Sequence, residues 1–392
     1  MTRVKLLLTS YIASLIALFF YSFTQVDLSL TLSKLSVYQT IEKSFQYIGF
    51  FERPLSTEIL TVIIVMLFMF YILIMYFVNK KAVALKHLKI IIPLTFVILV
   101  FSYNAFSYDL FNYIFDAKIL THYSLNPYMY KATDFPSDPM LNFMRWTHRT
   151  FPYGPTWLLL TVPLSYLGMN IFLPTFFMFK LLMGVSYLGS CYLIYKISEK
   201  IFPENKLLNL SFFAFNPLVI IESLVSSHND IPMIFLFLLS IYLFLVKKKI
   251  FSFLSYLLSI GVKFSTGFFL PMGIYLFYAE RAKKKVDWEK FFAVSFLLSI
   301  VTVMLATYRT TYQPWYLILP FSLGAFIPKK YYVFIPTLVA SVFSTAMYIP
   351  YVYMTDYAKG YPQIILNIQM LGVLAVIVFT LAYYFKIKLS SR

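Results

Sequence analysis

Long apolar segments alternate with short polar connections along most of the chain. A helix needs about 20 mainly apolar residues to cross a bilayer, and many of these segments approach that length. The pattern predicts about twelve spans, over residues 4–25, 58–78, 88–106, 171–195, 207–225, 231–246, 250–263, 266–280, 290–307, 314–327, 331–350 and 364–386. We therefore predict an all-α, polytopic transmembrane protein in which residues 1–392 form a single domain.

Two apolar segments need separate treatment. The first, VKLLLTSYIASLIALFFYSF (4–23), is about as long as a full span, and no small-residue cleavage motif follows it. It is predicted to be an uncleaved first helix rather than a signal peptide. The segment TWLLLTVPLSYLG (156–168) contains Pro163 and would be only about 20 Å long as a helix. We predict that it lies at the interface or dips into the membrane.

Composition and charge support a membrane location and an orientation. The chain is 60% hydrophobic and 12% charged, which excludes a soluble globule with a polar surface. Its net charge of +17 lies mostly in every second connection, including Lys80 and Lys81, Lys247–Lys249 and Lys283–Lys285. This pattern is typical of cytoplasmic loops, so it indicates membrane topology and not nucleic-acid binding. We expect a multi-pass cell-membrane protein with both termini in the cytoplasm.

The remaining connections are then expected on the extracytoplasmic face, and they hold most of the acidic residues. These connections are 26–57, 107–170, 226–230, 308–313 and 351–363. The longest of them, 107–170, is predicted to contain interfacial helices and to close a catalytic cavity.

The most polar stretch, SYDLFNYIFDAKILTHYSLNPY (107–128), follows directly after an apolar segment. If its part DLFNYIFDAKIL (109–120) is helical, Asp109, Asn112, Tyr113 and Asp116 share one face, because the last three follow Asp109 by three, four and seven residues. A carboxylate such as Asp109 at a partly apolar helix end can act as a general base toward a sugar hydroxyl. The alternative is that these polar groups only face lipid headgroups and water.

A second polar cluster, ESLVSSHNDIP (222–232), lies between two apolar segments on the same predicted face. His228, Asn229 and Asp230 together are more than a turn requires, which favours a functional role over a plain loop. His228 and Asp230 are two residues apart, so a divalent cation is an open alternative. No DxD pair occurs at Asp109, and we predict no metal and no cofactor.

Two further outer segments contain candidates for substrate contacts, and one lysine lies deeper, inside a predicted helix. Lys263, in SIGVKFSTGFF, is a cation with apolar neighbours that suits a lipid phosphate, although it could also simply extend to the headgroups. In YRTTYQPWY, Arg309 and Gln313 accompany Trp315, which could stack on a sugar or mark the interface. Lys180 lies about 14 Å into its predicted helix, where an ionisable group needs a partner or a function.

The absence of several catalytic motifs reduces the number of possible reactions. The chain has no Walker A, HExxH or GxSxG motif. An enzyme that works outside the cell has no nucleotide sugar available, so its donor must be an activated sugar that has already crossed the bilayer. A lipid-linked phosphosugar meets this need.

In this order, SYDLFNYIFDAKILTHYSLNPY, FPYGPTW, FNPLVIIESLVSSHND, VKFSTGFFLP and TYQPWYLILP resemble the GT-C superfamily of integral membrane glycosyltransferases. The likeness covers residues 100–325 and is closest to bacterial polyprenol-phosphate-mannose-dependent mannosyltransferases. It implies inverting transfer of a hexosyl unit, expected to be mannosyl, from a polyprenyl-phosphate sugar to a glycan or glycolipid acceptor. Many members carry a second carboxylate beside the first, whereas here Asn112 and Asp116 are the nearest polar groups, which again favours a metal-independent reaction.

The resemblance also implies roles for individual residues. Asp109 matches the general base. His228 and Asp230 match the polar cluster that orients donor or acceptor, and Lys263 and Arg309 are candidates for the departing phosphate. The remaining expected substrate contacts are Asn112, Asp116, Tyr153, Gln313 and Trp315.

Two other classes of function stay open. A transporter or flippase for a lipid-linked glycan would have a similar hydropathy pattern. A scaffold in an envelope complex would give Asp109, His228 and Lys263 no reason to lie close together.

Overall fold

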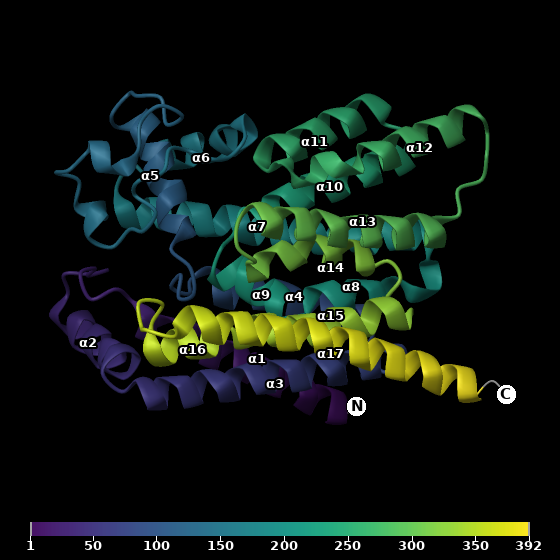
Figure 1. Ribbon diagram of the computed structural model, residues 1–392, viewed down its shortest axis with the longest axis horizontal. Coiled ribbons are helices and arrows are strands. Elements are labelled where there is room, and N and C mark those ends of the chain that lie inside the picture. The colour runs from purple at the N-terminus through teal and green to yellow at the C-terminus, as the bar shows by residue number, and fades with distance from the viewer. Residues whose placement is uncertain (1, 391–392) are drawn as a thin grey trace.

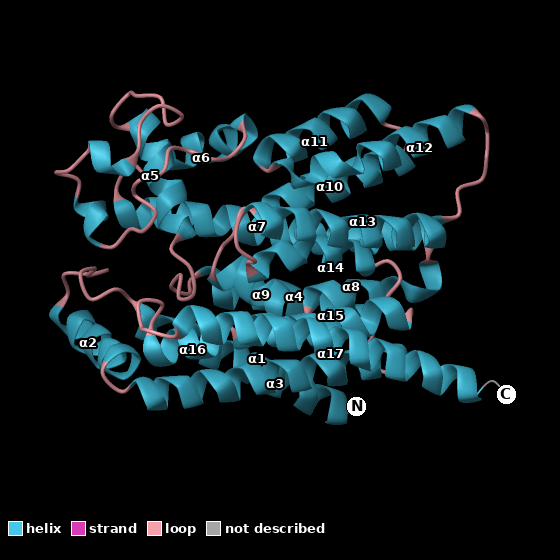
Figure 2. Ribbon diagram, viewed as in Figure 1, coloured by secondary structure: helices cyan, strands magenta, loops and turns pink. Residues whose placement is uncertain are grey.

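The computed structural model describes residues 2–390, and regular structure in this part of the chain is entirely helical (Figures 1 and 2). Its α-helices are α1 (Thr2–Ser22), α2 (Ser36–Phe50), α3 (Arg53–Asn79), α4 (Leu85–Val100), α5 (Asp109–Thr121), α6 (Pro155–Leu167), α7 (Phe172–Ile201), α8 (Lys206–Ala214), α9 (Pro217–Ile220), α10 (Asp230–Leu245), α11 (Lys249–Val262), α12 (Leu270–Arg281), α13 (Trp288–Arg309), α14 (Ile318–Gly324), α15 (Tyr331–Ala346), α16 (Tyr348–Met354) and α17 (Tyr361–Ser390). The predicted all-α class is confirmed. Arg392, which adds to the positive charge near the C-terminus of the sequence, lies outside the described residues.

The helices confirm a multi-pass membrane protein but not a count of twelve spans. Six spans are long and apolar enough to cross a membrane, and the bent pair Pro203–Ala214 and Pro217–Val225 would make a seventh. Helices α10, α11 and α12 have 16, 14 and 12 residues. At 1.5 Å per residue they are about 18–24 Å long, less than the roughly 30 Å hydrocarbon core. The predicted segments 231–246, 250–263 and 266–280 were already this short, so the count of twelve included helices that do not reach the length of a full span.

The long helices run side by side, and the two ends of the bundle differ (Figure 1). Helices α2, α5 and α6 and most long loops gather at the left end of the view, which we call the site end. The connections after α10 and α12, with Lys247–Lys249 and Lys283–Lys285, lie at the opposite end, which we call the basic end. Both labelled chain ends also lie away from α5 and α6.

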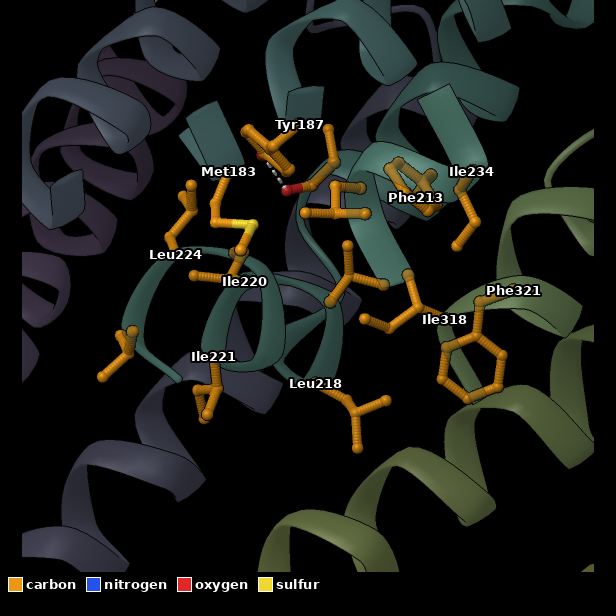
Figure 3. Packing of buried hydrophobic residues seen from close by; sticks show 14 of the residues in the cluster. Met183, Tyr187, Phe213, Leu218, Ile220, Ile221, Leu224, Ile234, Ile318 and Phe321 are labelled. Carbon is orange, nitrogen blue, oxygen red and sulfur yellow. Dashed lines mark hydrogen bonds between the residues drawn. The ribbon is translucent and has the colours of Figure 1, made fainter. Parts of the chain in front are cut away.

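A widened helical turn lies in the middle of the core. Asn216 caps α9, and its side chain accepts hydrogen bonds from the N–H groups of Leu218 and Val219 at 3.0 and 3.4 Å. Directly after α9, residues Ile221–Val225 form one π-helical turn, which often marks a functional site. Figure 3 shows its apolar side chains packed among those of neighbouring helices.

Buried Lys180 of α7 holds the end of this π-turn. Its Nζ donates to the carbonyls of Leu224 and Val225, the latter at 3.2 Å, and to Ser102 Oγ at 3.1 Å. These bonds answer the question that the sequence raised, because the ionisable group at this depth has structural partners. The turn is therefore fixed from α7 and from the end of α4.

The loop 107–170 packs back onto the bundle. Helix α5 has the predicted extent, but it is enclosed rather than interfacial, since apolar residues on both sides of it are buried. Helix α2, which was not predicted, instead exposes a row of large apolar side chains, as expected of an interfacial helix. Arg145 joins the loop to a distant connection through an ion pair with Asp356.

Two glycines bring the loop close to α11. A Cβ on Gly154, at the start of α6, would lie 2.3 Å from the carbonyl oxygen of Gly261, and a Cβ on Gly261 would lie 2.2 Å from Thr156 Oγ1. Only glycine fits this approach. As a result, Tyr153 and Lys263, each next to or near one of these glycines, are held in the same region.

Candidate functional site

Asp109 is the first residue of α5, where free backbone N–H groups and the helix dipole favour a negative charge. Its own N–H donates to Ser107 Oγ at 3.1 Å. The side chain is 17% exposed, so the carboxylate is partly shielded but can still be reached. This is a suitable position for a group that must accept a proton.

His228 joins two carboxylates. It lies in the short connection between the π-turn and α10, and its side chain is fully buried. Its Nδ1 is 3.4 Å from Asp109 Oδ2, and its Nε2 is 3.3 Å from Glu222 Oε2. Both distances are longer than those of well-formed hydrogen bonds but are within ion-pair range.

The charge state of His228 follows from this environment. Burial alone would lower the pKa of the imidazole, but the nearby carboxylates of Asp109 and Glu222 outweigh burial and raise it above its usual range. Tyr348 donates a hydrogen bond of 2.5 Å to Glu222 Oε1, which anchors that carboxylate. The arrangement favours an imidazolium between two anions.

Trp315 covers the imidazole. The two rings are stacked with centroids 3.7 Å apart and planes 17° apart. An indole face favours a cation, so this contact also suits a protonated ring. The next residue, Tyr316, has its ring 5.0 Å from Lys263 Nζ. The connection before α14 therefore contributes to both halves of the cluster.

Asp230 and Lys263 form the second half. Asp230 is the first residue of α10 and is nearly fully buried, and Lys263 lies in extended conformation after α11. The ammonium donates to both carboxylate oxygens, at 3.0 and 2.8 Å. Because a lysine has three donors, one remains for another anion.

A small cavity of about 50 Å³ opens beside Asp109. It is lined by Asp109, Asn112, Asp116, Ala132, Met144, Trp146, Arg149, Thr150, Pro152 and Tyr153. Burial and the negative charge of Asp109 raise the pKa of Asp116 to about 8, which favours its neutral form. Arg149 brings a positive charge to the same cavity. The cavity therefore joins proton-accepting, proton-donating and cationic groups.

Two predicted residues have no side-chain hydrogen bond or ion pair with this cluster over residues 2–390. Arg309 is exposed at the end of α13, and no ion pair or hydrogen bond of its side chain is seen within residues 2–390. Gln313 donates to Thr311 Oγ1 at 3.1 Å and has no contact with the other predicted residues in that range.

The sequence analysis gave no role to Glu222 or Tyr348. Glu222 was visible in ESLVSSHNDIP, but it is six residues before His228, a spacing that does not share a face of an α-helix. The π-turn and the left-handed backbone at Ser227 (φ 55°) fold the chain back, and His228 N–H donates to Glu222 O at 3.0 Å. No local signal marked Tyr348.

The cluster contains the groups that acid–base chemistry needs. Over the part of the chain that the structure describes, no group of three or more His, Cys, Asp or Glu side chains is arranged to hold a metal ion. The predicted metal independence stays a prediction. The arrangement can position a hydroxyl against Asp109, hold that carboxylate with His228, and place a cation, Lys263, near a leaving anion.

Comparison with known proteins gives one match. Residues 26–279 match the N-terminal domain of the MptA_B family, described as alpha-(1->6)-mannopyranosyltransferase. The matched region includes Asp109, Glu222, His228 and Lys263 but ends before Trp315. No curated protein and no solved structure matches the chain.

Proposed function

Because the chain belongs to this alpha-(1->6)-mannopyranosyltransferase family, which supports mannosyl transfer, we propose that it moves a mannosyl unit from a polyprenyl-phosphate sugar to a glycan or glycolipid acceptor. The family description suggests the 6-hydroxyl of a mannose as the acceptor group. Transfer is inverting, with Asp109 as the general base. The donor and the acceptor meet at the site end, on the extracytoplasmic face.

In the proposed reaction, the acceptor hydroxyl oxygen attacks the anomeric carbon while its proton moves to Asp109. The bond between the anomeric carbon and the phosphate oxygen breaks, and polyprenyl phosphate leaves with the electron pair. Phosphate is a good leaving group once a cation faces it. The only co-reactants are the donor and the acceptor.

The observation that carries the proposal is the contact between Asp109 and His228, at 3.4 Å. These residues come from segments more than 100 positions apart, and a scaffold has no need to bring them together. His228, as an imidazolium between Asp109 and Glu222, orients the base. Trp315 keeps the imidazole plane fixed.

Lys263 is the proposed contact of the leaving phosphate, through the donor that Asp230 leaves free. The ion pair with buried Asp230 holds the Lys263 ammonium in place before the donor arrives. Arg149 supplies a second positive charge beside the cavity. Asn112, Asp116 and Tyr153 line the acceptor side. For Arg309 and Gln313, substrate contact stays a prediction without support from geometry.

The distribution of charge supports the assignment of faces. Lysines gather at the basic end, as cytoplasmic connections do, so the site end is assigned to the outside and both termini to the cytoplasm. A donor with its sugar already across the bilayer needs no nucleotide at this site. The bilayer itself supplies the path for the donor lipid.

The test is transfer by purified protein in detergent, with a radiolabelled polyprenyl-phosphate mannose and a mannose-containing acceptor. The unmodified protein should form product, and Asp109→Asn should lower kcat/KM by about 100-fold or more. Glu58→Gln, an exposed carboxylate of α3, is the matched control and should keep normal activity. Thermal unfolding of both variants checks that each is folded.

Two results would overturn the proposal. Normal turnover by Asp109→Asn would remove Asp109 as the base. Absence of product in detergent, together with donor translocation in vesicles, would favour a flippase, because transport requires a closed membrane and glycosyl transfer does not.

A further inference from the structure

An apolar cleft opens between helices α10, α11, α12 and α13, away from the candidate site. Its volume is about 280 Å³, and its lining is almost entirely aliphatic and aromatic, with Ile241, Phe253, Met272 and Phe291 as examples. This is slightly below the roughly 300–1,000 Å³ of typical ligand pockets. A flexible hydrocarbon chain is the kind of ligand that such a surface accepts.

The cleft belongs to the half of the bundle nearest the basic end. It begins at Lys249, the first residue of α11, and its furthest lining residue on that helix is Tyr256, about 10 Å further along. On α13 it includes only residues close to the helix start, such as Phe291. Lys263, at the other end of α11, does not line it. A lipid chain in this cleft would therefore have its headgroup at the basic end.

A polar pocket of about 510 Å³ continues the cleft at that end. Phe244 and Leu276 line both spaces, so the two are adjacent. The pocket is lined by Lys247, the lysines of the α12–α13 connection (Lys283–Lys285) and Trp288. The same connection is the long loop at the right end of the bundle in Figure 1. Tryptophan beside lysines is typical of the headgroup level of a membrane.

The positive charge of this pocket exceeds its negative charge. Glu280 is the acidic residue of the lining, and it pairs with Lys247 at 2.8 Å and with Lys249 at 3.2 Å. Within residues 2–390, neither Lys283 nor Lys285 has an ion pair with an acidic side chain. Two or more ammonium groups are thus available for an anion beside an apolar cleft.

We propose that this cleft and pocket together bind one anionic phospholipid, with an acyl chain between α10, α11, α12 and α13 and the phosphate on Lys283 and Lys285. Juxtamembrane lysine clusters attract anionic headgroups, and here the apolar cleft adds shape selection. The site is distinct from the proposed catalytic cluster, so it goes beyond the proposed function. Its occupant is a bilayer lipid of the leaflet at the basic end and not the donor.

The test is native mass spectrometry of the full-length protein in detergent, titrated with phosphatidylglycerol or phosphatidylcholine. The tightest bound lipid should be phosphatidylglycerol. The triple variant Lys283→Ala/Lys284→Ala/Lys285→Ala should weaken its binding by about tenfold or more. The control variant Lys80→Ala/Lys81→Ala/Lys86→Ala removes equal charge from another basic connection and should change binding by less than about twofold.

Variants at Gly273 test the apolar cleft separately from the lysines. A Cβ on Gly273, which lines the cleft, would meet no atom within 4 Å, so a larger side chain enters open space without a clash. Gly273→Leu should fill the cleft and release the lipid, whereas Gly273→Ala should retain it. Equal binding of the two lipids, equal loss in both triple variants, retention by Gly273→Leu, or displacement by free glycerol phosphate would each overturn the proposal.

Discussion

The carboxylate of Glu222 lies 3.3 Å from Nε2 of His228, across the ring from Asp109, which lies 3.4 Å from Nδ1. The buried imidazole thus bridges one anion that the solvent can reach and one that it cannot. Tyr348 completes the buried side through its hydrogen bond to Glu222. A substitution at Glu222 should therefore change the pKa of His228 and, through His228, the charge beside Asp109.

Glu222→Gln should lower the pKa of His228. One of the two anions that favour the charged ring is lost, while burial, which favours the neutral ring, is unchanged. NMR titration of the imidazoles measures this directly, and His228→Gln identifies the signal among the four histidines. Mannosyl transfer should decline with rising pH at a lower pH in the variant, because Asp109 loses its cationic partner earlier.

The stability of the protein gives a second readout of the same change. Since the folded-state pKa of His228 is raised, its contribution to stability is complete below the ordinary histidine pKa and disappears as pH rises through the raised value. Glu222→Gln should reduce that contribution. An unchanged His228 titration in the variant would mean that Glu222 does not hold the ring in its charged form.

Asp116→Asn should stabilise the protein increasingly as pH rises. The pKa of Asp116 is raised from about 3.8 to about 8, so ionisation is more costly in the folded chain than in the unfolded one. The unmodified protein therefore becomes less stable as pH rises from about 4 to about 8. The variant does not, because asparagine does not ionise. The measurement is the difference in Tm between variant and unmodified protein. A difference that is constant from about pH 5 to about pH 8 would contradict it.

Lys180→Met should destabilise the bundle by about 1–3 kcal/mol, because the carbonyls of Leu224 and Val225 lose their side-chain donor in a buried place. Methionine has a similar length and leaves no large cavity. Thermal unfolding measures the loss. Transfer activity should fall as well, since the π-turn positions Glu222 and His228. Lys196→Met, on the same helix at a partly exposed ion pair, is the control and should change Tm little.

The arrangement of apolar segments predicted much of the fold, since each predicted span contains helix and α5 has the expected extent. The count of twelve spans was not confirmed, because it included apolar segments such as 231–246 and 250–263 that form helices shorter than a full span. Helix α2 was missed because polar residues interrupt its sequence, so its apolar residues form no continuous run and gather along one face only once the helix has formed.

The sequence by itself determined the membrane class, the asymmetry of charge between the two ends, and the presence of Asp109, His228 and Lys263 on polar connections. These depend on composition and order, which act locally through burial in lipid and through membrane orientation. Only the tertiary structure decided that Glu222 faces His228, that Trp315 stacks on His228, and that Lys180 bonds to the end of the π-turn. Those relations depend on a π-turn and on packing between distant helices, where side-chain directions and not sequence spacing set the distances.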